Sequence, residues 1–599
     1  MTAVYGVVGT ATPAELDEMG RRLSHRGAQA SWREVAPNVF LGCATHEPST
    51  PLQCGSWHAV VDTPGEVYER ISEALSRSGD ALDICELTPH PFALAAWDAR
   101  SQSLLLGRDF FGVKPLHYCR LPSGGIAFAT EYKALLALDE VTVEADRDSV
   151  SYLQICKAVP PGRTLLRGIS PVPPGCLMRF DRQGNALEIR RMPEVRVDVR
   201  PMNEERAAAM LRKALLEATE RLVRGKSHIA IAMSGGIDSL AVASMARACA
   251  PSAELLAFTV AAHAADPEVD RAAEVVAKLH GRHESIAVSN EELVAKLPLA
   301  VWHLENPIGR TETFQFFALA KRARERGVDS LLSGMGADLL FAGMPRHKVL
   351  WMAECAPWLR EDLLQFYTAT QTGEPARRWL ARCMTKLYFR GELPRPPSVS
   401  GAAPPDVELL ASWGPEFLNR CLILDGQEPT SRTLARIERP LQAYSIEYAS
   451  PYLDRSVAEL AFRIPGRLKI KRGTQKYILR RAMQPLLGPR ISRAPKELMR
   501  MQPGMQFSQA LGELARRYLN PDRVRRRGFF DPEQIDSLTR TCVRARHPEV
   551  TMRLWTAILT EIWAEIYLDG RGRQPLPAAV SAEPRATWVP ATTTIAATP

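Results

Sequence analysis

Short apolar runs separated by turn residues dominate the chain up to about residue 195. For example, apolar-rich segments at 116–119 and 126–129 flank the turn sequence Pro-Ser-Gly-Gly at 122–125. Short runs joined by turns that contain Gly and Pro are typical of antiparallel hairpins. We therefore expect residues 1–195 to form a hairpin-rich, antiparallel domain.

The pattern changes after Met202. A long helix-type segment comes first, and apolar runs at 255–260 and 330–332 then alternate with helical patterns at 270–279 and 314–326. Such alternation predicts a parallel sheet covered by helices, with ligands bound at the carboxyl ends of its strands.

Two stretches do not follow this alternation. Between about 345 and 440 the pattern loosens, and proline-rich sequence within it predicts a surface excursion. From about residue 573 the chain is rich in Pro, Ala and Thr, which predicts a disordered tail over 573–599. The chain thus divides into a first domain over 1–195, a second over 202–572, and the tail.

The apolar run 229–233 leads directly into Ser234-Gly235-Gly236-Ile237-Asp238-Ser239. Adjacent glycines let backbone N–H groups approach a phosphate, the two serine hydroxyls add donors, and the helical stretch that follows favours negative charge at its start. Asp238 would repel a phosphate unless a cation lay between them, which argues for Mg²⁺. The spacing is not that of a Walker loop. It looks like the pyrophosphate loop of enzymes that split ATP into AMP and pyrophosphate. The alternative is a glycine-rich turn after a buried strand, which would require neither the acid nor the hydroxyls.

The composition excludes several classes of protein. The 599 residues are 46% hydrophobic and 24% charged, which is ordinary for a globular protein of several domains. The sequence has no run of eighteen apolar residues and no basic start followed by an apolar segment, so we expect neither secretion nor a membrane span. Its eleven cysteines form no Cys-x-x-Cys pair, which predicts reduced thiols in the cytoplasm.

Part of the formal charge of +9 is concentrated near the C-terminus, at Arg516, Arg517, Arg523, Arg525, Arg526 and Arg527. A solvated basic face is the simplest interpretation of this cluster, and docking of an acidic partner or peptide is the alternative. No aromatic interleaving or helix-turn-helix pattern accompanies the arginines, so we expect no nucleic-acid binding.

Eight sequence blocks resemble class B asparagine synthetases and their descendants, over most of residues 1–500. Four lie in the first domain, at 25–27, 92–98, 107–116 and 129–135, and four in the second, at 234–239, 333–338, 450–454 and 476–480. The resemblance implies an α+β domain of the N-terminal-nucleophile, glutaminase-like type. An α/β synthetase domain of the adenine-nucleotide α-hydrolase-like (ATP pyrophosphatase) type, with a parallel sheet, would follow it.

The first domain departs from the family where glutamine would be hydrolysed. The family requires cysteine directly after the initiator methionine, because its thiolate attacks the glutamine amide. Thr2 occupies that position, and Pro64-Gly65-Glu66-Val67-Tyr68-Glu69 stands where the family has Asn-Gly-Glu-Ile-Tyr-Asn. An N-terminal threonine can also act as a nucleophile, but the pocket sequence has changed as well. We therefore expect an inactive glutaminase domain that is retained as structure.

In the second domain the resemblance implies an intact adenylating site. Asp238 and Asp338 would hold Mg²⁺ on the phosphates of ATP, since hard oxygen ligands suit this ion. Lys476 would neutralise charge on the α-phosphate as the acyl-adenylate forms and collapses. The positions expected to bind ATP are Met233, Ser234, Gly235, Gly236, Asp238, Ser239, Val260, Ser333 and Gly334.

Met335 argues against asparagine as the product. Asparagine synthetases carry glutamate at this position and β-lactam-forming relatives carry tyrosine, whereas a thioether cannot take a proton. Methionine also leaves room for a larger apolar substrate. We therefore expect a bulky acceptor, and the general base remains unassigned.

Among relatives without a working glutaminase, the chain looks most like the lasso-peptide cyclases. These enzymes adenylate an Asp or Glu side chain of a core peptide, and the peptide's own α-amine closes a macrolactam ring. The resemblance implies ATP and Mg²⁺ as cofactors, a precursor peptide as substrate, and a leader-binding protein and a leader-peptide protease as partners. The alternatives are another amide-forming ligase such as a β-lactam synthetase, an ammonia-dependent asparagine synthetase, and a non-enzymatic scaffold.

Overall fold

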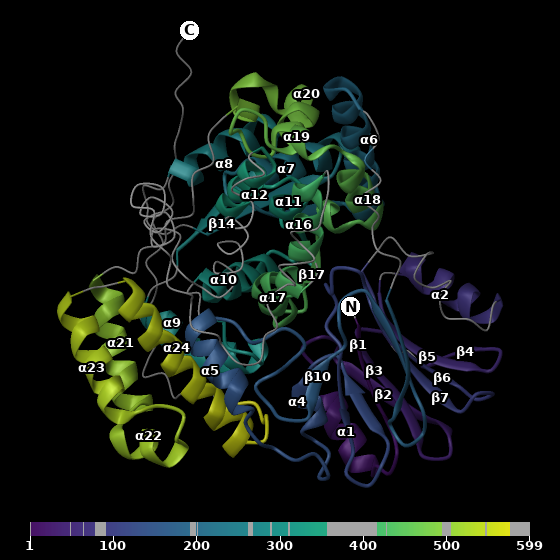
Figure 1. Cartoon of the computed structure of the whole chain (residues 1–599). Helices are drawn as coiled ribbons and strands as arrows, with labels where there is room; N and C mark the ends of the chain where they lie inside the picture. Colours follow the sequence, from purple (N-terminus) through teal and green to yellow (C-terminus); the bar gives the residue numbers. More distant parts are fainter. Residues whose placement is uncertain are drawn as a thin grey trace.

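The computed structural model describes residues 2–47, 50–63, 65–77, 91–191, 199, 202–260, 267–287, 290–308, 312–355, 416–426, 428–493, 505–545 and 548–575. Figure 1 shows two sheets in the N-terminal part and a third sheet that is surrounded by helices. A group of C-terminal helices (yellow-green) lies beside the N-terminal part. The proline-rich sequence at 393–405 and nearly all of the expected tail lie outside the described residues.

The N-terminal part contains two antiparallel sheets, ordered β10-β8-β9-β1-β3-β2 and β12-β11-β7-β6-β5-β4. The hairpin expected around residues 122–125 is present, because β8 and β9 pair antiparallel with His117 opposite Ala129. The strands of the first sheet are β1 (Thr2–Val8), β2 (Gln29–Ala36), β3 (Val39–Thr45), β8 (His117–Arg120), β9 (Ile126–Ala129) and β10 (Ile169–Pro171). Those of the second are β4 (Leu52–Cys54), β5 (Trp57–Asp62), β6 (Ala93–Asp98), β7 (Ser103–Arg108), β11 (Cys176–Phe180) and β12 (Ala186–Arg191).

The two sheets pack face to face over an apolar layer that includes Val4, Leu106, Phe128 and Met178. Every residue of β6 and β7 is buried, since both faces of these strands are covered. Helices of this part are α1 (Pro13–Arg21), α2 (Gly65–Arg77), α4 (Tyr132–Leu135) and α5 (Arg147–Cys156).

The second part contains the expected parallel sheet, ordered β15-β14-β13-β16-β17. From β13 the chain continues to β14 on one side, and β16 pairs on the other, so the strand order reverses there. In open parallel sheets, ligands bind at such a reversal, outside the carboxyl ends of the strands. The strands are β13 (His228–Ala232), β14 (Glu254–Val260), β15 (Arg282–Ile286), β16 (Ser330–Leu332) and β17 (Glu447–Ala449).

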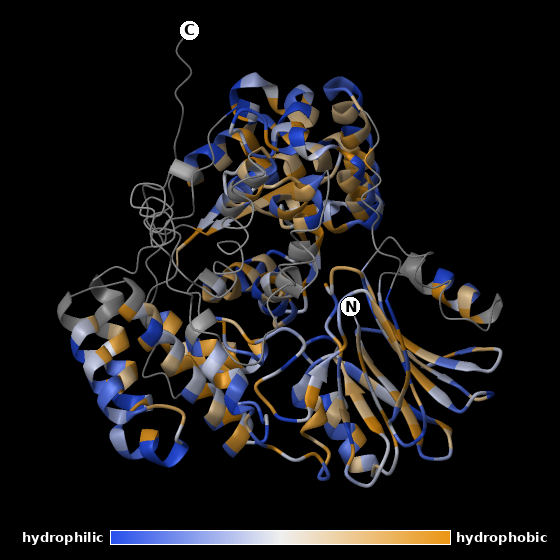
Figure 2. Cartoon of the chain, in the orientation of Figure 1, coloured by the Kyte–Doolittle hydropathy of each residue, from blue (hydrophilic) through white to orange (hydrophobic). Residues whose placement is uncertain are grey.

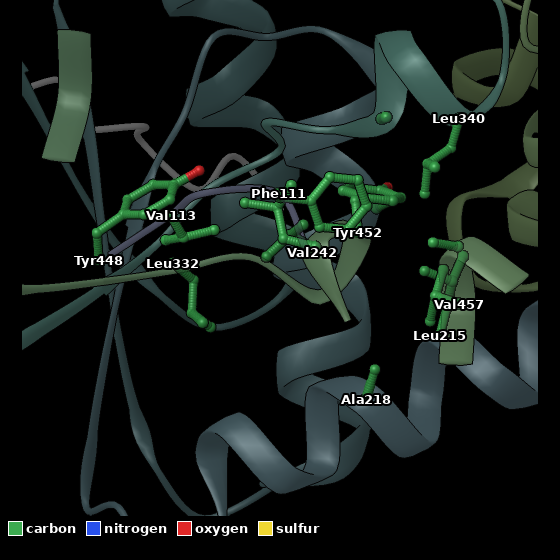
Figure 3. Close-up of a cluster of buried hydrophobic side chains, with 14 of the residues drawn as sticks. Phe111, Val113, Leu215, Ala218, Val242, Leu332, Leu340, Tyr448, Tyr452 and Val457 are labelled. Atoms are coloured by element: carbon green, nitrogen blue, oxygen red, sulfur yellow. The ribbon is translucent and has the colours of Figure 1, made fainter. Parts of the chain in front are cut away.

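Helix α7 packs on this sheet and α6 packs on α7, with an extensive apolar core. Figure 3 shows Leu215 and Ala218 of α6, Val242 of α7 and Leu332 of β16 as parts of one buried apolar cluster that includes Tyr452. The helices around the sheet are α6 (Glu204–Val223), α7 (Ile237–Cys249), α8 (Pro267–Lys278), α9 (Asn290–Leu304), α10 (Glu312–Glu325), α11 (Ala337–Leu340), α18 (Arg455–Arg463), α19 (Gly466–Lys469) and α20 (Tyr477–Arg493).

Part of the stretch expected to be loose is helical. Helices α12 (Pro345–Cys355), α16 (Phe417–Gly426) and α17 (Glu428–Gln442) fall within 345–442. The expected loosening is wrong for these helices, because apolar side chains such as those of Leu418 and Leu422 are fully buried in the same core as the parallel sheet.

The C-terminal helices pack on the N-terminal part rather than on the parallel sheet. Their apolar side chains share one core with α4, α5 and α9. Trp563 donates from its indole nitrogen to the Tyr132 hydroxyl at 3.0 Å, and Arg571 donates to the Leu138 carbonyl at 3.0 Å. These helices are α21 (Met505–Tyr518), α22 (Pro521–Arg527), α23 (Pro532–Ala545) and α24 (Pro548–Ala564), followed by a π-helical turn over Glu565–Asp569.

Two arginines of the basic cluster have structural ion pairs. Arg523 lies 2.7 Å from Glu561, and Arg527 lies 2.6 Å from Asp569, so both hold α22 against the end of the α24 segment. Figure 2 shows α22 in hydrophilic colours at the surface. Acidic side chains of this chain therefore already neutralise part of the cluster, which favours the solvated-face interpretation over docking of an acidic partner.

The structure bears on two features that the composition raised, membrane-spanning helices and cysteine pairing, within the described residues. Every helix there is too short or too polar to span a bilayer. None of the eight cysteines whose side chains are described forms a disulfide.

Candidate active site

The loop between β13 and α7 lies at the carboxyl edge of the parallel sheet. The Ser234 N–H donates to Ser239 Oγ at 3.1 Å, and the Ser239 hydroxyl donates to the Gly236 carbonyl at 3.2 Å. Gly235 precedes Gly236, which is the N-cap residue of α7 and supplies no side-chain acceptor. The loop therefore presents backbone donors and the positive end of a helix to an anion.

The loop that follows β16 packs directly on this first loop. A Cβ atom on Gly334 would lie 2.7 Å from the Ser239 nitrogen, so only glycine fits there. Ser333 Oγ lies 2.9 Å from the Tyr448 hydroxyl, and the Ser450 hydroxyl donates to the Met335 carbonyl at 2.7 Å. The close approach at Gly334 thus places the two loops side by side, and the two hydrogen bonds fix the second loop to β17 and to the residue that follows it.

Lys476 joins the two loops through their aspartates. Its Nζ lies 2.6 Å from Asp338 Oδ1 and also forms an ion pair with Asp238 Oδ2. The lysine side chain is 1% exposed, whereas the Asp238 and Asp338 side chains are 19% and 32% exposed. The three residues that the sequence motifs singled out therefore converge, with both carboxylates partly open to solvent.

Electrostatics in this cluster favour a charged lysine. Burial disfavours the ammonium, but the two carboxylates outweigh burial and raise the pKa of Lys476. In the first turn of α20, burial lowers the pKa of Arg480, and Asp238 acts in the opposite direction. Two cationic and two anionic side chains thus approximately balance at this edge.

The cluster suits a magnesium ion shared with phosphates. Both carboxylates contact one ammonium nitrogen, so they lie close enough together to bind a single cation. Among the described residues, no group of three or more His, Cys, Asp or Glu side chains forms a complete metal cage. Mg²⁺ commonly binds through one or two carboxylates plus substrate phosphates, and Asp238 and Asp338 fit that mode.

The motifs did not single out Gly343 and Gln475. A Cβ atom on Gly343 would lie 1.9 Å from Asp338 Oδ1 and 2.1 Å from Lys476 Cε, so a side chain at residue 343 would displace both groups. The Gln475 amide donates to the carbonyls of Ala342 and Met344 at 2.9 and 2.7 Å. Both residues fix the backbone around the lysine, and only their position in the folded chain reveals this role.

Two of the residues expected to bind ATP, which the family resemblance places beside adenine, occupy the ends of neighbouring strands. Met233 follows β13 and donates its N–H to the Phe258 carbonyl at 2.8 Å, and Val260 ends β14. Both side chains are buried at the carboxyl edge. Their contact with a base stays a prediction.

In the N-terminal part, Thr2 begins β1 and pairs with Thr45 of β3. The altered sequence of the expected glutamine pocket includes Pro64 and residues 65–68. Pro64 and the side chains of residues 65–68 lie outside the described residues. Nearby, Asp62 ends β5 and lies 3.1 Å from Lys114, which lies 3.7 Å from Glu447 of β17. This chain of charges, in which Asp62 and Lys114 are buried and Glu447 is partly exposed, connects the N-terminal strands to the edge of the parallel sheet.

Comparison with protein families assigns both parts of the chain. The asparagine synthase model matches residues 210–565, and a glutamine amidotransferase domain model matches residues 68–190. The chain belongs to the asparagine synthase family. Its fold is therefore a glutamine amidotransferase domain of the N-terminal-nucleophile type, followed by a synthetase domain with a parallel sheet. The amidotransferase match begins after Thr2.

Curated relatives fall into more than one branch of the family. A Mycobacterium tuberculosis protein provisionally named asparagine synthetase [glutamine-hydrolyzing] is 29% identical over 68% of this chain and 66% of its own length. Asparagine synthetase [glutamine-hydrolyzing] 1 of Bacillus subtilis is 25% identical over 80% of this chain and 78% of its length. Carboxyethyl-arginine β-lactam-synthase of Streptomyces clavuligerus is 31% identical over 56% of this chain and 63% of its length. The chain thus spans about two thirds of the length of the first of these.

Proposed function

We propose that this asparagine synthase family member is an ATP-dependent carbon–nitrogen ligase. It would activate a carboxylate as an acyl-adenylate with release of pyrophosphate, and an amine would then displace AMP. The observation that carries the proposal is the convergence of Lys476, Asp238 and Asp338 beside a phosphate-type loop, at the strand-order reversal of a parallel sheet.

Each part of the site has a role in this chemistry. Backbone donors of the loop at 234–239 and the start of α7 bind the phosphates. Asp238 and Asp338 would hold Mg²⁺, which neutralises phosphate charge and orients the leaving pyrophosphate. Lys476 stabilises the negative charge that grows on the α-phosphate in both half-reactions, from a position that Gly343 and Gln475 fix.

We propose that the amine does not come from glutamine. Thr2 stands where the family has its cysteine nucleophile, and the amidotransferase match does not include this end of the chain. An amine that is already part of the substrate needs no ammonia source. Holding that amine beside the acyl-adenylate also makes the second step intramolecular, which accelerates it.

Met335 supports a bulky acceptor. It lies in the loop after β16, next to the Asp338 segment, and it is partly buried. A thioether takes no part in proton transfer but adapts to irregular apolar surfaces. Free aspartate is a small, charged substrate that this side chain would not favour.

The function we favour is closure of a macrolactam in a peptide, as in lasso-peptide cyclases. The substrate would be a precursor peptide whose α-amine attacks an adenylated Asp or Glu side chain. A leader-binding protein and a leader-peptide protease would act with it, in the cytoplasm. The similarity to a β-lactam synthase of Streptomyces clavuligerus favours a second candidate, which is ring closure in a small β-amino acid derivative. The Bacillus subtilis relative supports a third, ammonia-dependent asparagine synthesis.

The decisive experiment measures AMP, pyrophosphate and product together. Purified protein is incubated with ATP, Mg²⁺ and one of three substrates: peptides with a free α-amine and an internal Asp or Glu, N-carboxyethyl-arginine, or aspartate with ammonia. We expect AMP release with a peptide, together with loss of one water from its mass. Cyclisation of the small substrate or formation of asparagine would instead identify the second or third candidate.

Asp238→Asn and Asp338→Asn serve as matched controls. Removing either metal-binding charge should abolish detectable turnover while the protein stays folded, because transition-state stabilisation falls by several kcal/mol, on the order of 10³-fold or more in rate. Activity within about tenfold of the parent protein in either variant would remove that residue from the site. Substrate-dependent AMP release would exclude the scaffold alternative.

A further inference from the structure

The strand β12 forms one edge of the second N-terminal sheet. Among the described strands it pairs only with β11. Leu187 and Ile189 on β12 are each 58% exposed, which makes them the most exposed large apolar side chains of the described residues. An edge strand with exposed apolar side chains is a template for pairing with another strand.

The register of β12 on β11 shifts at Leu187, which is skipped between the partners of Arg179 and Phe180, and it is regular from Glu188 to Arg191. Ile189 lies opposite Met178 of β11, and Met178 belongs to the apolar layer between the two sheets. Ile189 therefore extends this layer beyond the last strand. The described residues leave Leu187 and Ile189 each 58% exposed, whereas they bury the side chains of the layer.

The other face of β12 carries one acid and one base. Glu188 and Arg190 form an ion pair with each other, and both are partly exposed. The strand therefore alternates apolar residues on one face with a negative and a positive residue on the other.

We propose that β12 pairs with β12 of a second copy of this chain, antiparallel and across a two-fold axis at Ile189. In this register Ile189 faces the partner's Ile189, and Glu188 faces the partner's Arg190 on both sides of the axis. Leu187 faces the partner's Arg191, whose aliphatic stem can cover it. The sheet that contains β12 in one copy and the same sheet in the other copy would then form one continuous sheet. The apolar layers of the two copies would meet at this junction.

Charge selects this register over its neighbours. Shifting the axis to residue 188 places the two Glu188 carboxylates opposite each other, and shifting it to residue 190 does the same for the two Arg190 side chains. Like charges directly opposite one another destabilise a strand pair, whereas opposite charges stabilise it. Intermediate registers would place apolar side chains on the polar face.

A second copy is the occupant that the sequence of the strand fits best, since the strand is complementary to itself. A two-fold interface requires the same patch on both subunits to be self-complementary. The order Glu188-Ile189-Arg190 meets this requirement, because inverting it places each charge opposite its counterpart.

The test uses charge reversals and measures mass in solution by sedimentation and light scattering. The parent protein should be a dimer. Glu188→Arg and Arg190→Glu should each weaken dimerisation by about tenfold or more, because both cross-strand pairs become like-charged. The double variant with both changes should dimerise as the parent protein does. Lys213→Glu, on the exposed surface of α6, is the control and should leave the dimer unchanged.

Mixing the two single variants gives the sharpest result. A chain with two arginines and a chain with two glutamates complement each other in the proposed register, so the mixture should recover a heterodimer that neither variant forms alone. Altered folding of a single variant cannot produce this recovery. A monomeric parent protein, or a dimer that neither reversal weakens, would overturn the proposal.

Discussion

Arg26 in the N-terminal part donates to Glu438 of α17 at 2.9 Å, and both side chains are buried. This pair belongs to a larger buried set that we call the interdomain charge network, which consists of Arg26, Lys133, Arg439, Glu131, Glu305 and Glu438. Arg439 lies 2.6 Å from Glu131 and 3.1 Å from Glu305, so it bridges carboxylates from separate elements. The network holds three acidic and three basic side chains, so its formal charges balance.

Removing one member should destabilise the protein strongly. Arg439→Met removes one buried counter-charge from Glu131 and Glu305 and leaves the network with an uncompensated negative charge, so we expect a loss of about 3–5 kcal/mol in the free energy of unfolding. Arg167→Met, which removes an exposed ion pair with Glu144, should cost less than about 1 kcal/mol. Urea unfolding followed by fluorescence measures both. Equal effects of the two substitutions would show that the network contributes no more than a surface pair.

The network also predicts acid sensitivity. Burial alone would raise the pKa of Glu131, but Lys133, His25, Arg26 and Arg439 together hold it well below its ordinary value. A carboxyl group with a depressed folded-state pKa contributes stability that is present above its unfolded pKa, about 4.3, and is lost as pH falls further. The melting temperature should therefore drop steeply below about pH 4. Glu131→Gln should lower it at neutral pH and flatten the acid limb. An unchanged acid limb would assign the sensitivity to other groups.

A buried lysine outside the active site predicts a second rise of stability with pH, in an alkaline window. Lys469 has no hydrogen-bond partner for its Nζ among the described residues and lies 4.7 Å from the centre of the Phe462 ring. Burial lowers its pKa to about 7, against the influence of Glu416 and Glu354. The unfolded state therefore binds more protons between pH 7 and about 10.4, so stability should rise with pH in this window.

Lys469→Met tests this assignment directly. The substitution keeps an unbranched apolar chain and removes the buried amine, so we expect a gain of about 1–3 kcal/mol at pH 7. The rise in melting temperature between pH 7 and 10 should also become smaller. If the variant is less stable than the parent protein, the attraction of Glu416 and Glu354 exceeds the burial cost.

Lys476→Met should separate ATP binding from turnover. The ammonium matters most where charge builds on the α-phosphate, so turnover should fall on the order of 10³-fold while ATP affinity changes little. Lys476→Arg should fail as well, because Gly343 packs against Lys476 Cε and leaves no room for a planar guanidinium. Isothermal titration with ATP alongside an AMP assay measures both quantities. A parallel collapse of ATP affinity would make Lys476 a ground-state ligand.

Thr2→Ala should leave synthesis unchanged. If the amine comes from the substrate itself, neither the hydroxyl nor glutamine is required, and glutamine should yield no glutamate. Isotopically labelled glutamine amide followed by mass spectrometry checks both points. Release of glutamate that the substitution abolishes would restore the glutaminase to the mechanism.

Local sequence patterns were sufficient to predict the elements whose apolar residues follow one clear period. The β8–β9 hairpin and the strands β13, β14 and β16 are of this kind, since each is an apolar run that ends at a turn or loop signal. The strands β15 and β17 gave no such signal. Arg282–Ile286 is mostly polar, Glu447–Ala449 has three residues, and both lie at sheet edges, where burial imposes little pattern.

The site shows the same division. Motifs indicated Asp238, Asp338 and Lys476 because each lies in a short block that resembles the family, and the structure brings them together. The sequence motifs did not indicate Gly343 and Gln475. Both residues matter because the segments around residues 338 and 476 lie close together in the folded chain, which the sequence alone does not show. The network around Arg26 and Glu438 was equally hidden, since its members lie up to several hundred positions apart in the sequence.

The hydrogen bond from Arg571 to the Leu138 carbonyl has a consequence for biosynthesis. The ribosome makes the N-terminal sheets first, but the helix surface that carries Tyr132 receives part of its cover from Trp563 of α24 and from the residues that follow it. This part of the surface therefore stays apolar and uncovered until α24 has been translated. The nascent N-terminal part should depend on chaperones for most of that interval, and a premature stop before Trp563 should send it to proteolysis rather than release a stable fragment.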